Sequence, residues 1–412
     1  ARIKFCTKLA GQDSWFLPFD KGYNDGAGNP PNPDGLMTDY LWKDILTKEK
    51  LTLIIENYAQ VVVEVDEDTK KKKEKQIFPR YHQLDVVTKL LADVKANGVG
   101  KKYLIQHSAG SGKSNSIAWL AHQLIGLEQD GRPMLDSVIV VTDRRILDKQ
   151  IRDTIKQFMQ VGSTVAWAEH SSDLTKAIVG GKRIIVTTIE KFPYSAPQII
   201  AENMNRRFAI IIDEAHSGQN GKNSSQMNTA LSGIEFTDNM DDEDRINAMV
   251  EGRKLLNNAS YFAFTATPKN KTLETFGVPY QDGDDIKHRP FHVYTMKQAI
   301  QEGFILDVLQ YYTPIDSFYK LMKTVEDDPM FDKKRAQKKL RSFVESDSYT
   351  IAKKAAMMVD HFHEQVIAKG KIGGQARAMV VTSSIPRCIE YYYAINKCLA
   401  DRHSPYKTII AF

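Results

Sequence analysis

The chain has 412 residues, and at roughly 150 residues per domain this length predicts two to three domains that can each bury a core. A composition of 42% apolar and 26% charged residues excludes a disordered or fibrous protein. Lys and Arg exceed Asp and Glu by 5 (56 − 51), an excess too small to indicate nucleic acid or a membrane surface by itself. No apolar run approaches the roughly 18 residues of a membrane span, so we expect no membrane partner. Three cysteines without a Cys-x-x-Cys pattern are typical of a reducing compartment, and we expect the cytoplasm.

The N-terminal region divides into three parts. Residues 1–36 are rich in Gly, Pro, Asn and Asp, which favour loops. The stretch from Thr38 to Val65 predicts one or two helices followed by a short β-branched strand. Asp66 to Lys75 is a charged run with no apolar residue to bury, and it predicts an exposed linker. We therefore place a domain boundary near Gln76.

From Phe78 to about Pro268, short β-rich runs alternate with amphipathic segments of helical length, a pattern typical of an α/β domain with a buried parallel sheet. The predicted strands are Tyr103–Gln106, Val138–Thr142, Arg183–Thr188, Phe208–Asp213 and Tyr261–Thr265. A polar stretch over residues 277–290 separates a further region, which ends in a predicted strand, helix and strand at Ala378–Ser383, Pro386–Leu399 and Thr408–Phe412.

The strongest chemical signal follows the first of these strands. The sequence Gln106-His-Ser-Ala-Gly-Ser-Gly-Lys-Ser114 lies between a strand and an amphipathic helix. A phosphate-binding loop needs small residues such as Gly110, Ser111 and Gly112 so that backbone N–H groups can surround the phosphates. Lys113 then reaches the β and γ phosphates, and the Ser114 hydroxyl reaches Mg²⁺. The alternative, a Gly-rich turn with an incidental Lys, is disfavoured by this strand-loop-helix context.

The first glycine of the usual phosphate-loop pattern is absent. His107 occupies its position.

A second signal lies at the end of the strand that leads to Asp213. There Ile210-Ile-Ile-Asp-Glu-Ala-His216 joins an apolar run to two carboxylates. Asp213 is suited to hold Mg²⁺ together with Ser114, Glu214 to deprotonate the attacking water, and His216 to contact the γ phosphate. Alone, these residues could be a solvated strand terminus. After a phosphate loop, they predict the hydrolytic half of an ATP site.

Together, Gly-Ser-Gly-Lys-Ser and Asp-Glu-Ala-His resemble the nucleotide site of superfamily 2 helicases and translocases. Other segments extend the resemblance. Tyr81-His-Gln83 resembles the adenine-reading segment, with Gln83 as its reader, and Thr265-Ala-Thr-Pro268 resembles the motif in which Thr265 and Thr267 couple hydrolysis to movement. The run Ala378-Met-Val-Val-Thr-Ser-Ser384 resembles the opening strand of the second motor domain.

Four longer segments narrow the resemblance to the motor, or restriction, subunit of type I restriction-modification enzymes. They are Pro18-Phe-Asp-Lys-Gly22 with Gly28-Asn-Pro-Pro31, Phe78-Pro-Arg-Tyr-His-Gln83, Val141-Thr-Asp-Arg-Arg-Ile-Leu-Asp-Lys-Gln150 and Phe264-Thr-Ala-Thr-Pro-Lys-Asn270. The resemblance implies an α/β fold of tandem RecA-like motor domains with parallel sheets. Residues 1–76 would join a nuclease outside this sequence, 77–276 would form the first motor domain, and 277–412 would form a linker and an incomplete second motor domain.

The resemblance also implies a function. Such subunits are prokaryotic, ATP- and Mg²⁺-dependent motors that pump double-stranded DNA before unmodified DNA is cleaved, and they assemble with methyltransferase and specificity subunits. The sequence departs from the family in containing no Glu-x-Lys nuclease triplet, so we expect the cleavage centre outside it. We also expect the arginine motif late in the second motor domain to lie outside this sequence. Two alternatives remain: a superfamily 2 DNA repair helicase, and a structural module of the complex that does not hydrolyse ATP.

By the same resemblance, residues just beyond strand ends contact the DNA backbone. These are Thr142, Arg144, Arg145, Thr188 and Ser383. The basic run Lys333–Arg341 is either a further phosphate contact or a solvated helix face. His361 and His363 lack the spacing of a zinc site, and we expect no zinc there.

Overall fold

The computed structural model describes residues 2–7, 9–65, 72–142, 155, 165–168, 170–188, 205–213, 258–307, 348–370 and 376–411. The chain forms two compact units, Ala1–Asp307 and Val308–Phe412. Among the described residues, no helix is long and apolar enough to cross a membrane.

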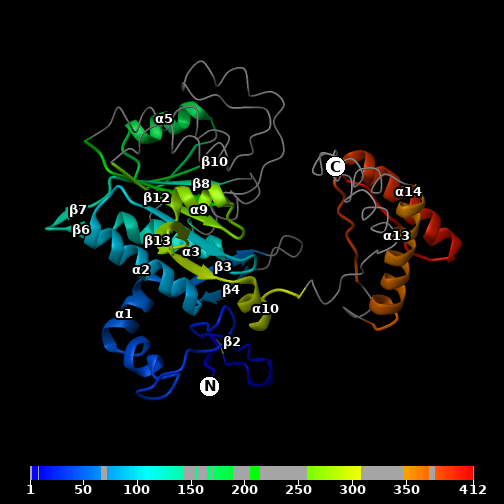
Figure 1. The fold of residues 1–412 in the computed structure, drawn as a ribbon, viewed down its shortest axis with the longest axis horizontal. Coiled ribbons are helices and arrows are strands. Elements are labelled where there is room, and N and C mark those ends of the chain that lie inside the picture. The colour runs from blue at the N-terminus through cyan, green and yellow to red at the C-terminus, as the bar shows by residue number, and fades with distance from the viewer. Residues whose placement is uncertain are drawn as a thin grey trace. The chain divides into compact units, whose positions relative to one another are not determined.

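The first unit contains the sheet (Figure 1). Its helices are η1 (Gly11–Asp13), η2 (Leu41–Ile45), α1 (Lys48–Asn57), α2 (Tyr81–Asn97), α3 (Lys113–Ile125), α5 (Ser171–Val179), α9 (Asn270–Phe276) and α10 (Met296–Gln301). Its strands are β1 (Lys4–Phe5), β2 (Leu17–Pro18), β3 (Gln60–Val65), β4 (Lys72–Ile77), β5 (Lys102–His107), β6 (Glu128–Gln129), β7 (Arg132–Pro133), β8 (Ser137–Thr142), β9 (Val165–Trp167), β10 (Ile184–Thr188), β11 (Phe208–Asp213), β12 (Ala259–Thr265), β13 (Val278–Asp282), β14 (Asp285–Arg289) and β15 (His292–Tyr294).

Seven strands form one sheet in the order β15-β5-β12-β11-β8-β10-β9. Every pairing in this sheet is parallel. The predicted α/β class with a parallel sheet of the RecA-like type is therefore confirmed, and all five predicted strands lie in this sheet. Two of its strands, β9 and β15, were not predicted; each has only three residues, too few to show a pattern in the sequence.

The sheet separates two hydrophobic cores because successive residues of a strand point to opposite faces. In β8, Val138 and Val140 join one core, and Ile139 and Val141 join the other. Helices α2 and α3 cover the first face, and α5 and α9 contribute to the second. Burial on both faces explains why these strands read as continuous apolar runs instead of alternating ones.

The N-terminal region packs onto the sheet unit. Phe19, in the segment predicted to be loop, is buried and contacts the ring of Tyr81 on α2 with centroids 5.7 Å apart. Tyr58, just after α1, packs on Trp119 of α3 at 5.6 Å, and the Trp119 indole N–H donates to the Tyr58 carbonyl. Residues before Gln76 therefore share the first hydrophobic core.

The prediction of an exposed linker over Asp66–Lys75 is wrong for its last four residues. Lys72–Ile77 form β4, which pairs antiparallel with β3. The charged residues of β4 need no burial of their own, because the hairpin is held to the first core by Val62 of β3 and by Ile77 at the end of β4. The first unit and its sheet also extend beyond residue 276, the predicted end of the first motor domain, because β15 pairs with β5.

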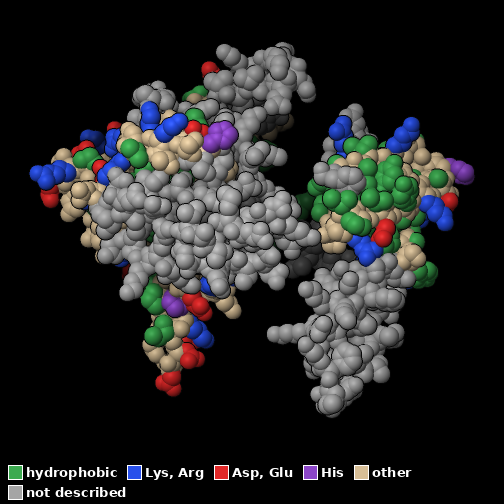
Figure 2. All heavy atoms as spheres, turned by 90° about the horizontal axis from the view of Figure 1, so that it is seen from above, with side chains coloured by type: hydrophobic (Ala, Val, Ile, Leu, Met, Phe, Trp, Pro, Cys, Tyr) green, Lys and Arg blue, Asp and Glu red, His purple; other side chains and the backbone are tan. Residues whose placement is uncertain are grey.

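The second unit is described as helices α13 (Ser348–His361) and α14 (Ile385–Asp401) with the π-helical turn η6 (Phe362–Ile367). The helix predicted over Pro386–Leu399 is confirmed. Residues 378–383 and 408–411 are not strands, because neither segment has a ladder partner among the described residues. Figure 2 shows hydrophobic side chains gathered on one face of this unit. Met379, Val381 and Ile409 are among the exposed hydrophobic residues of the unit. The second RecA-like sheet remains a prediction.

Candidate nucleotide site

One edge of the sheet, where the parallel strands end, holds the described site residues that end or follow a strand: Thr142, Thr188, Asp213, Thr265 and the loop after β5. The register aligns Thr265 with Gln106, Asp213 with Phe264, and Thr188 with Thr142. Strand β12 lies between β5 and β11, so the two predicted halves of the ATP site are on strands that are next but one to each other. Open α/β sheets bind ligands at this carboxyl edge.

The loop between β5 and α3 has the backbone that its glycines allow. Gly110 and Gly112 have φ of +71° and +74°, a region that L side chains rarely adopt. A Cβ at Gly110 would lie 2.6 Å from Cγ2 of Ile305, and one at Gly112 would lie 2.6 Å from Nε2 of Gln83. Both glycines are therefore required by conformation and by space. The loop delivers the chain to the N-terminus of α3, where Lys113 and Ser114 lie in the first turn.

Three side chains from the start of α2 bind the carbonyls of this loop. Arg80 Nη2 donates to the Gly110 carbonyl at 2.9 Å, and His82 Nε2 lies 3.0 Å from the Ser111 carbonyl. Gln83 Nε2 donates to the Gly112 carbonyl at 3.0 Å and to the Ser111 carbonyl at 3.2 Å. Two backbone N–H groups of the loop are used within the protein, since Ser108 donates to the Tyr294 carbonyl at 2.9 Å and Ser111 donates to the Ser108 carbonyl at 3.3 Å. The first N–H groups of a helix such as α3 have no partner inside the helix and suit an anion.

Gln83, the predicted adenine reader, is buried and its amide is used inside the protein. Its Oε1 accepts from the backbone N–H of Arg80 at 2.9 Å, while its Nε2 serves the loop. In this structure Gln83 therefore connects the start of α2 to the phosphate loop.

Arg80 adds a buried positive charge next to the loop. Its guanidinium lies 4.0 Å from the ring centroid of Phe304, and its Nη1 is buried without a hydrogen-bond partner among the described residues. Burial lowers the pKa of Arg80, and the nearby Tyr294 and Glu302 partly oppose this shift. An unsatisfied buried donor costs roughly 1–3 kcal/mol, more for a charged group.

Lys113 and Asp213 lie at the same carboxyl edge of the sheet, Lys113 at the start of α3 and Asp213 at the end of β11. The Lys113 ammonium lies 3.4 Å from the His107 carbonyl at the start of the loop. Asp213 ends β11 and its side chain is buried. Carboxylate and hydroxyl oxygens such as those of Asp213 and Ser114 suit Mg²⁺, which takes its remaining ligands from water and phosphate. Among the described residues, no cluster of three or more His, Cys, Asp or Glu forms a metal site of its own.

Several predicted residues lie outside the described part of the chain. Glu214, His216, Arg144 and Arg145 are among them, as is the basic run at 333–341.

Some described residues were predicted to couple hydrolysis to movement or to contact DNA. These residues lie at or near the ends of strands or helices. Thr265 is buried at the end of β12 and its Oγ1 accepts from the backbone N–H of Thr267 at 3.3 Å. Thr142 and Thr188 are buried at the ends of β8 and β10. Ser383 is exposed just before α14, in the second unit.

The sequence analysis missed Arg80, His82, His292 and Tyr294 as parts of this site. Arg80 and His82 stand in the quoted segment beside Gln83, so the segment itself was a signal for them. The ring of His82 stacks on Tyr294 with centroids 3.7 Å apart. Tyr294 and His292 lie in β15, far along the chain and without any motif, so only the fold brings them to the loop.

Comparison with known proteins agrees with this geometry. The chain is 26% identical over 316 residues to the type I restriction enzyme SsaAORF53P endonuclease subunit of Staphylococcus saprophyticus, an alignment covering 75% of this chain and 29% of the relative. It is 26% identical over 246 residues to the SauCOLORF180P endonuclease subunit of Staphylococcus aureus, covering 58% and 22%. The chain thus spans less than a third of these relatives. The predicted resemblance to the motor subunit of type I restriction enzymes is confirmed.

Among solved structures, the chain is similar to a fragment described as a candidate HsdR subunit of a type I restriction enzyme from Vibrio vulnificus. The likeness has a TM-score of 0.43 at 13% identity and covers 97% of this chain and 68% of the other. At this TM-score it adds no argument.

The family assignment rests on the motor region itself. A family model described as SWI2/SNF2 ATPase matches residues 82–341, which include the phosphate loop, β11 and β12. The match covers more than half of the chain, and it contains the carboxyl edge at which the candidate site lies. This chain belongs to the SWI2/SNF2 ATPase family.

Proposed function

We propose that the chain is the ATP-driven motor part of a type I restriction enzyme, one that pumps double-stranded DNA before unmodified DNA is cleaved. The observation that carries this proposal is the loop between β5 and α3, whose glycines, Lys113 and Ser114 lie at the same sheet edge as Asp213 and Thr265. The family match and the names of the relatives support it.

Each residue has a proposed role in hydrolysis. Lys113 neutralises charge on the β and γ phosphates, and Ser114 and Asp213 hold Mg²⁺. The magnesium ion, when bound, withdraws charge from the phosphates. Glu214 accepts a proton from the attacking water, and His216 contacts the γ phosphate.

The motion and the track use other residues. Thr265 and Thr267 couple hydrolysis to movement. Thr142, Arg144, Arg145, Thr188 and Ser383 contact the DNA backbone, which gives affinity without reading sequence. Methyltransferase and specificity subunits would supply recognition, and a nuclease centre outside this sequence would cut. The proposal places the protein in the prokaryotic cytoplasm.

The test is translocation by the full-length protein with its methyltransferase and specificity subunits, measured as displacement of a third strand from a DNA triplex. We expect Lys113→Ala to abolish displacement. Lys101→Ala is the matched control, since Lys101 lies at the opposite end of β5 and pairs with Asp93 at 3.1 Å. Normal displacement by Lys113→Ala would overturn the phosphate-loop assignment.

The same assay separates the two rival functions. Unwinding of a plain duplex, without triplex displacement, would indicate a repair helicase. Absence of ATP turnover by the complete wild-type complex would indicate a structural module.

A further inference from the structure

At the start of the phosphate loop, three side chains from three elements form a network of polar contacts. His107 Nε2, at the end of β5, lies 2.8 Å from His292 Nδ1 on β15. His292 Nε2 lies 3.0 Å from Asp85 Oδ2 on α2. His107 is fully buried, and the side chain of His292 is 9% exposed. His107 stands where the usual phosphate-loop pattern has its first glycine. The network of polar contacts therefore includes a side chain that the phosphate-loop motif does not require.

The direction of these hydrogen bonds follows from Asp85. A carboxylate only accepts, so His292 Nε2 carries the proton that it donates to Asp85. If the His292 ring carries only this one proton, its Nδ1 accepts from His107 Nε2. Hydrogen bonds from His292 and Lys89 lower the pKa of Asp85 although burial opposes this, so the carboxylate stays charged. In that protonation state, Asp85 fixes the tautomers of both rings.

The electrostatic surroundings keep His107 neutral. Burial lowers the pKa of His107 well below its usual value, and His292, His82, Lys113 and Arg80 lower it further. A neutral ring at this position adds no positive charge next to Lys113. The neutral imidazole of His107 therefore has a single N–H to donate.

This network of polar contacts joins strand β5, from which the phosphate loop begins, to helix α2, from which side chains bind the loop. His107 is the residue from which the loop departs, and its carbonyl lies next to the Lys113 ammonium. Asp85 lies on α2, two residues after Gln83, whose side chain binds the loop carbonyls. Because His292 contacts both residues, it fixes the start of the loop relative to the α2 side chains that bind the loop carbonyls.

We propose that His107 is a positioning residue for ATP binding, which His292 and Asp85 hold in the one orientation that keeps the phosphate loop ready for nucleotide. The inference rests on the proposed function, since it assumes that ATP is the ligand of the loop. It does not give His107 any contact with ATP.

The test uses two variants of one position in the full-length protein. In His292→Asn the amide oxygen can take the place of Nδ1, so the acceptor for His107 is kept and the contact to Asp85 is lost. In His292→Gln the amide takes the place of Nε2, so the contact to Asp85 is kept and the acceptor for His107 is lost. Tyr103→Phe, at the far end of β5, is the control for a general loss of stability.

We expect His292→Gln to raise the Kd of Mg-ATP and the KM for ATP by roughly threefold to tenfold, the equivalent of one neutral hydrogen bond. The kcat of His292→Gln should stay within about twofold of the wild-type value, because the three side chains of the network do not touch the reacting atoms. His292→Asn should raise the Kd and the KM by less, because it keeps the acceptor for His107 and loses only the contact to Asp85. His107→Gln, which keeps a donor at the Nε2 position, should show the smallest change, whereas His107→Asn should resemble His292→Gln.

The outcomes are distinguishable. If wild-type protein binds no ATP, the proposed function falls and this inference falls with it. If wild type binds ATP and the Asn and Gln variants of His292 have equal Kd values, the inference alone is overturned. A lower melting temperature in both variants with unchanged Kd would show a structural role and would also overturn it.

Discussion

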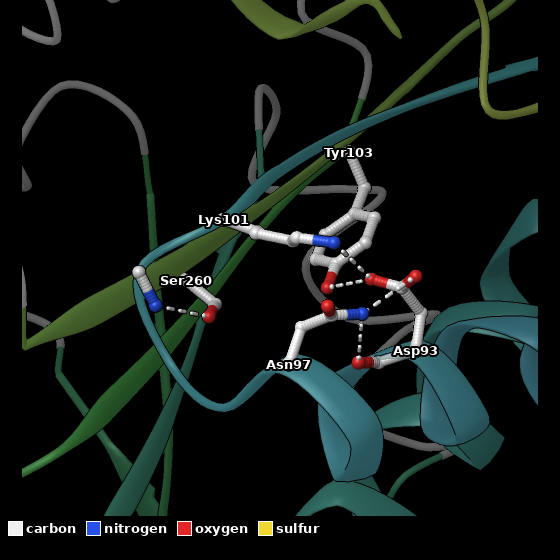
Figure 3. A network of polar contacts seen from close by, with 6 residues as sticks. Asp93, Asn97, Lys101, Tyr103 and Ser260 are labelled. Carbon is white, nitrogen blue, oxygen red and sulfur yellow. Dashed lines mark hydrogen bonds and ion pairs between the residues drawn. The ribbon is translucent and has the colours of Figure 1, made fainter.

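Helix α2 and strand β5 are joined by a polar network at each of their two ends, and the networks differ in reach. At the far end from the phosphate loop, Asp93 accepts from Tyr103 Oη at 2.8 Å and from Lys101 Nζ at 3.1 Å, and Asn97 donates to it (Figure 3). All these partners lie within ten residues of Asp93. At the loop end, Asp85 reaches β5 only through His292, 207 residues along the chain.

From this difference we infer that the Asp93 network contributes to stability, whereas the Asp85 network holds the phosphate loop. The Asp93 network closes a connection between neighbouring elements and can form as soon as α2 and β5 meet. Burial, reinforced by the Asp93 charge, raises the pKa of Tyr103, which keeps the phenol as a donor at all ordinary pH values. The Asp85 network forms only when β15 has paired with β5. It therefore ties the loop to the completed sheet.

The largest expected effect tests the claim that ATP hydrolysis depends on residues at the carboxyl edge of the sheet, where the phosphate loop lies. Glu214→Gln keeps the size of the side chain but removes the base, so ATP should still bind while hydrolysis falls by a factor of roughly 10² or more. Steady-state turnover together with equilibrium ATP binding measures both. Turnover equal to wild type would move the catalytic base to another residue.

The next prediction concerns the far end. Asp93→Ala leaves the Tyr103 hydroxyl and the Lys101 ammonium without their acceptor, and should lower the free energy of unfolding by about 1–3 kcal/mol. Its Kd for ATP should equal that of wild type, because Asp93 lies two helical turns from Asp85. Denaturant unfolding and ATP titration check the two halves. A change in ATP affinity as large as that of His292→Gln would remove the distinction between the two ends.

The smallest expected effect concerns DNA at the loop edge. Replacing Arg144 and Arg145 together by Ala should weaken binding to duplexes of any sequence by a similar factor and reduce the salt slope by about two, since each lost phosphate contact removes about 0.9 from it. ATP affinity should not change. If these arginines only pair with carboxylates such as Asp143 and Asp148, a thermal melt will show lower stability at an unchanged slope.

The comparison also shows what the sequence could predict. Strands β5, β8, β10, β11 and β12 were predictable because burial on both faces leaves continuous apolar runs. The phosphate loop was predictable because its residues are contiguous and their spacing is set by the ligand. Sequence could not predict β15, which is short, nor the partner of His107, since a contact over 185 residues leaves no local pattern.

The hairpin of β3 and β4 shows a second limit. Lys72 to Lys75 have no apolar residue to bury, and this reads as linker in sequence. Pairing with β3 supplies the backbone hydrogen bonds that a local reading cannot see. Composition excluded a core position for these residues, and that does not exclude a strand.

The central claim is that the carboxyl edge of the sheet, with the phosphate loop and the start of α2, is the nucleotide site, whereas the opposite edge is structural. Amide hydrogen exchange of the full-length protein, with and without Mg-ATP, tests it most directly. We predict slower exchange on ATP binding at residues 108–116 and 80–84, and unchanged exchange at 97–103. Protection confined to 97–103, or the same protection at both edges, would contradict the account.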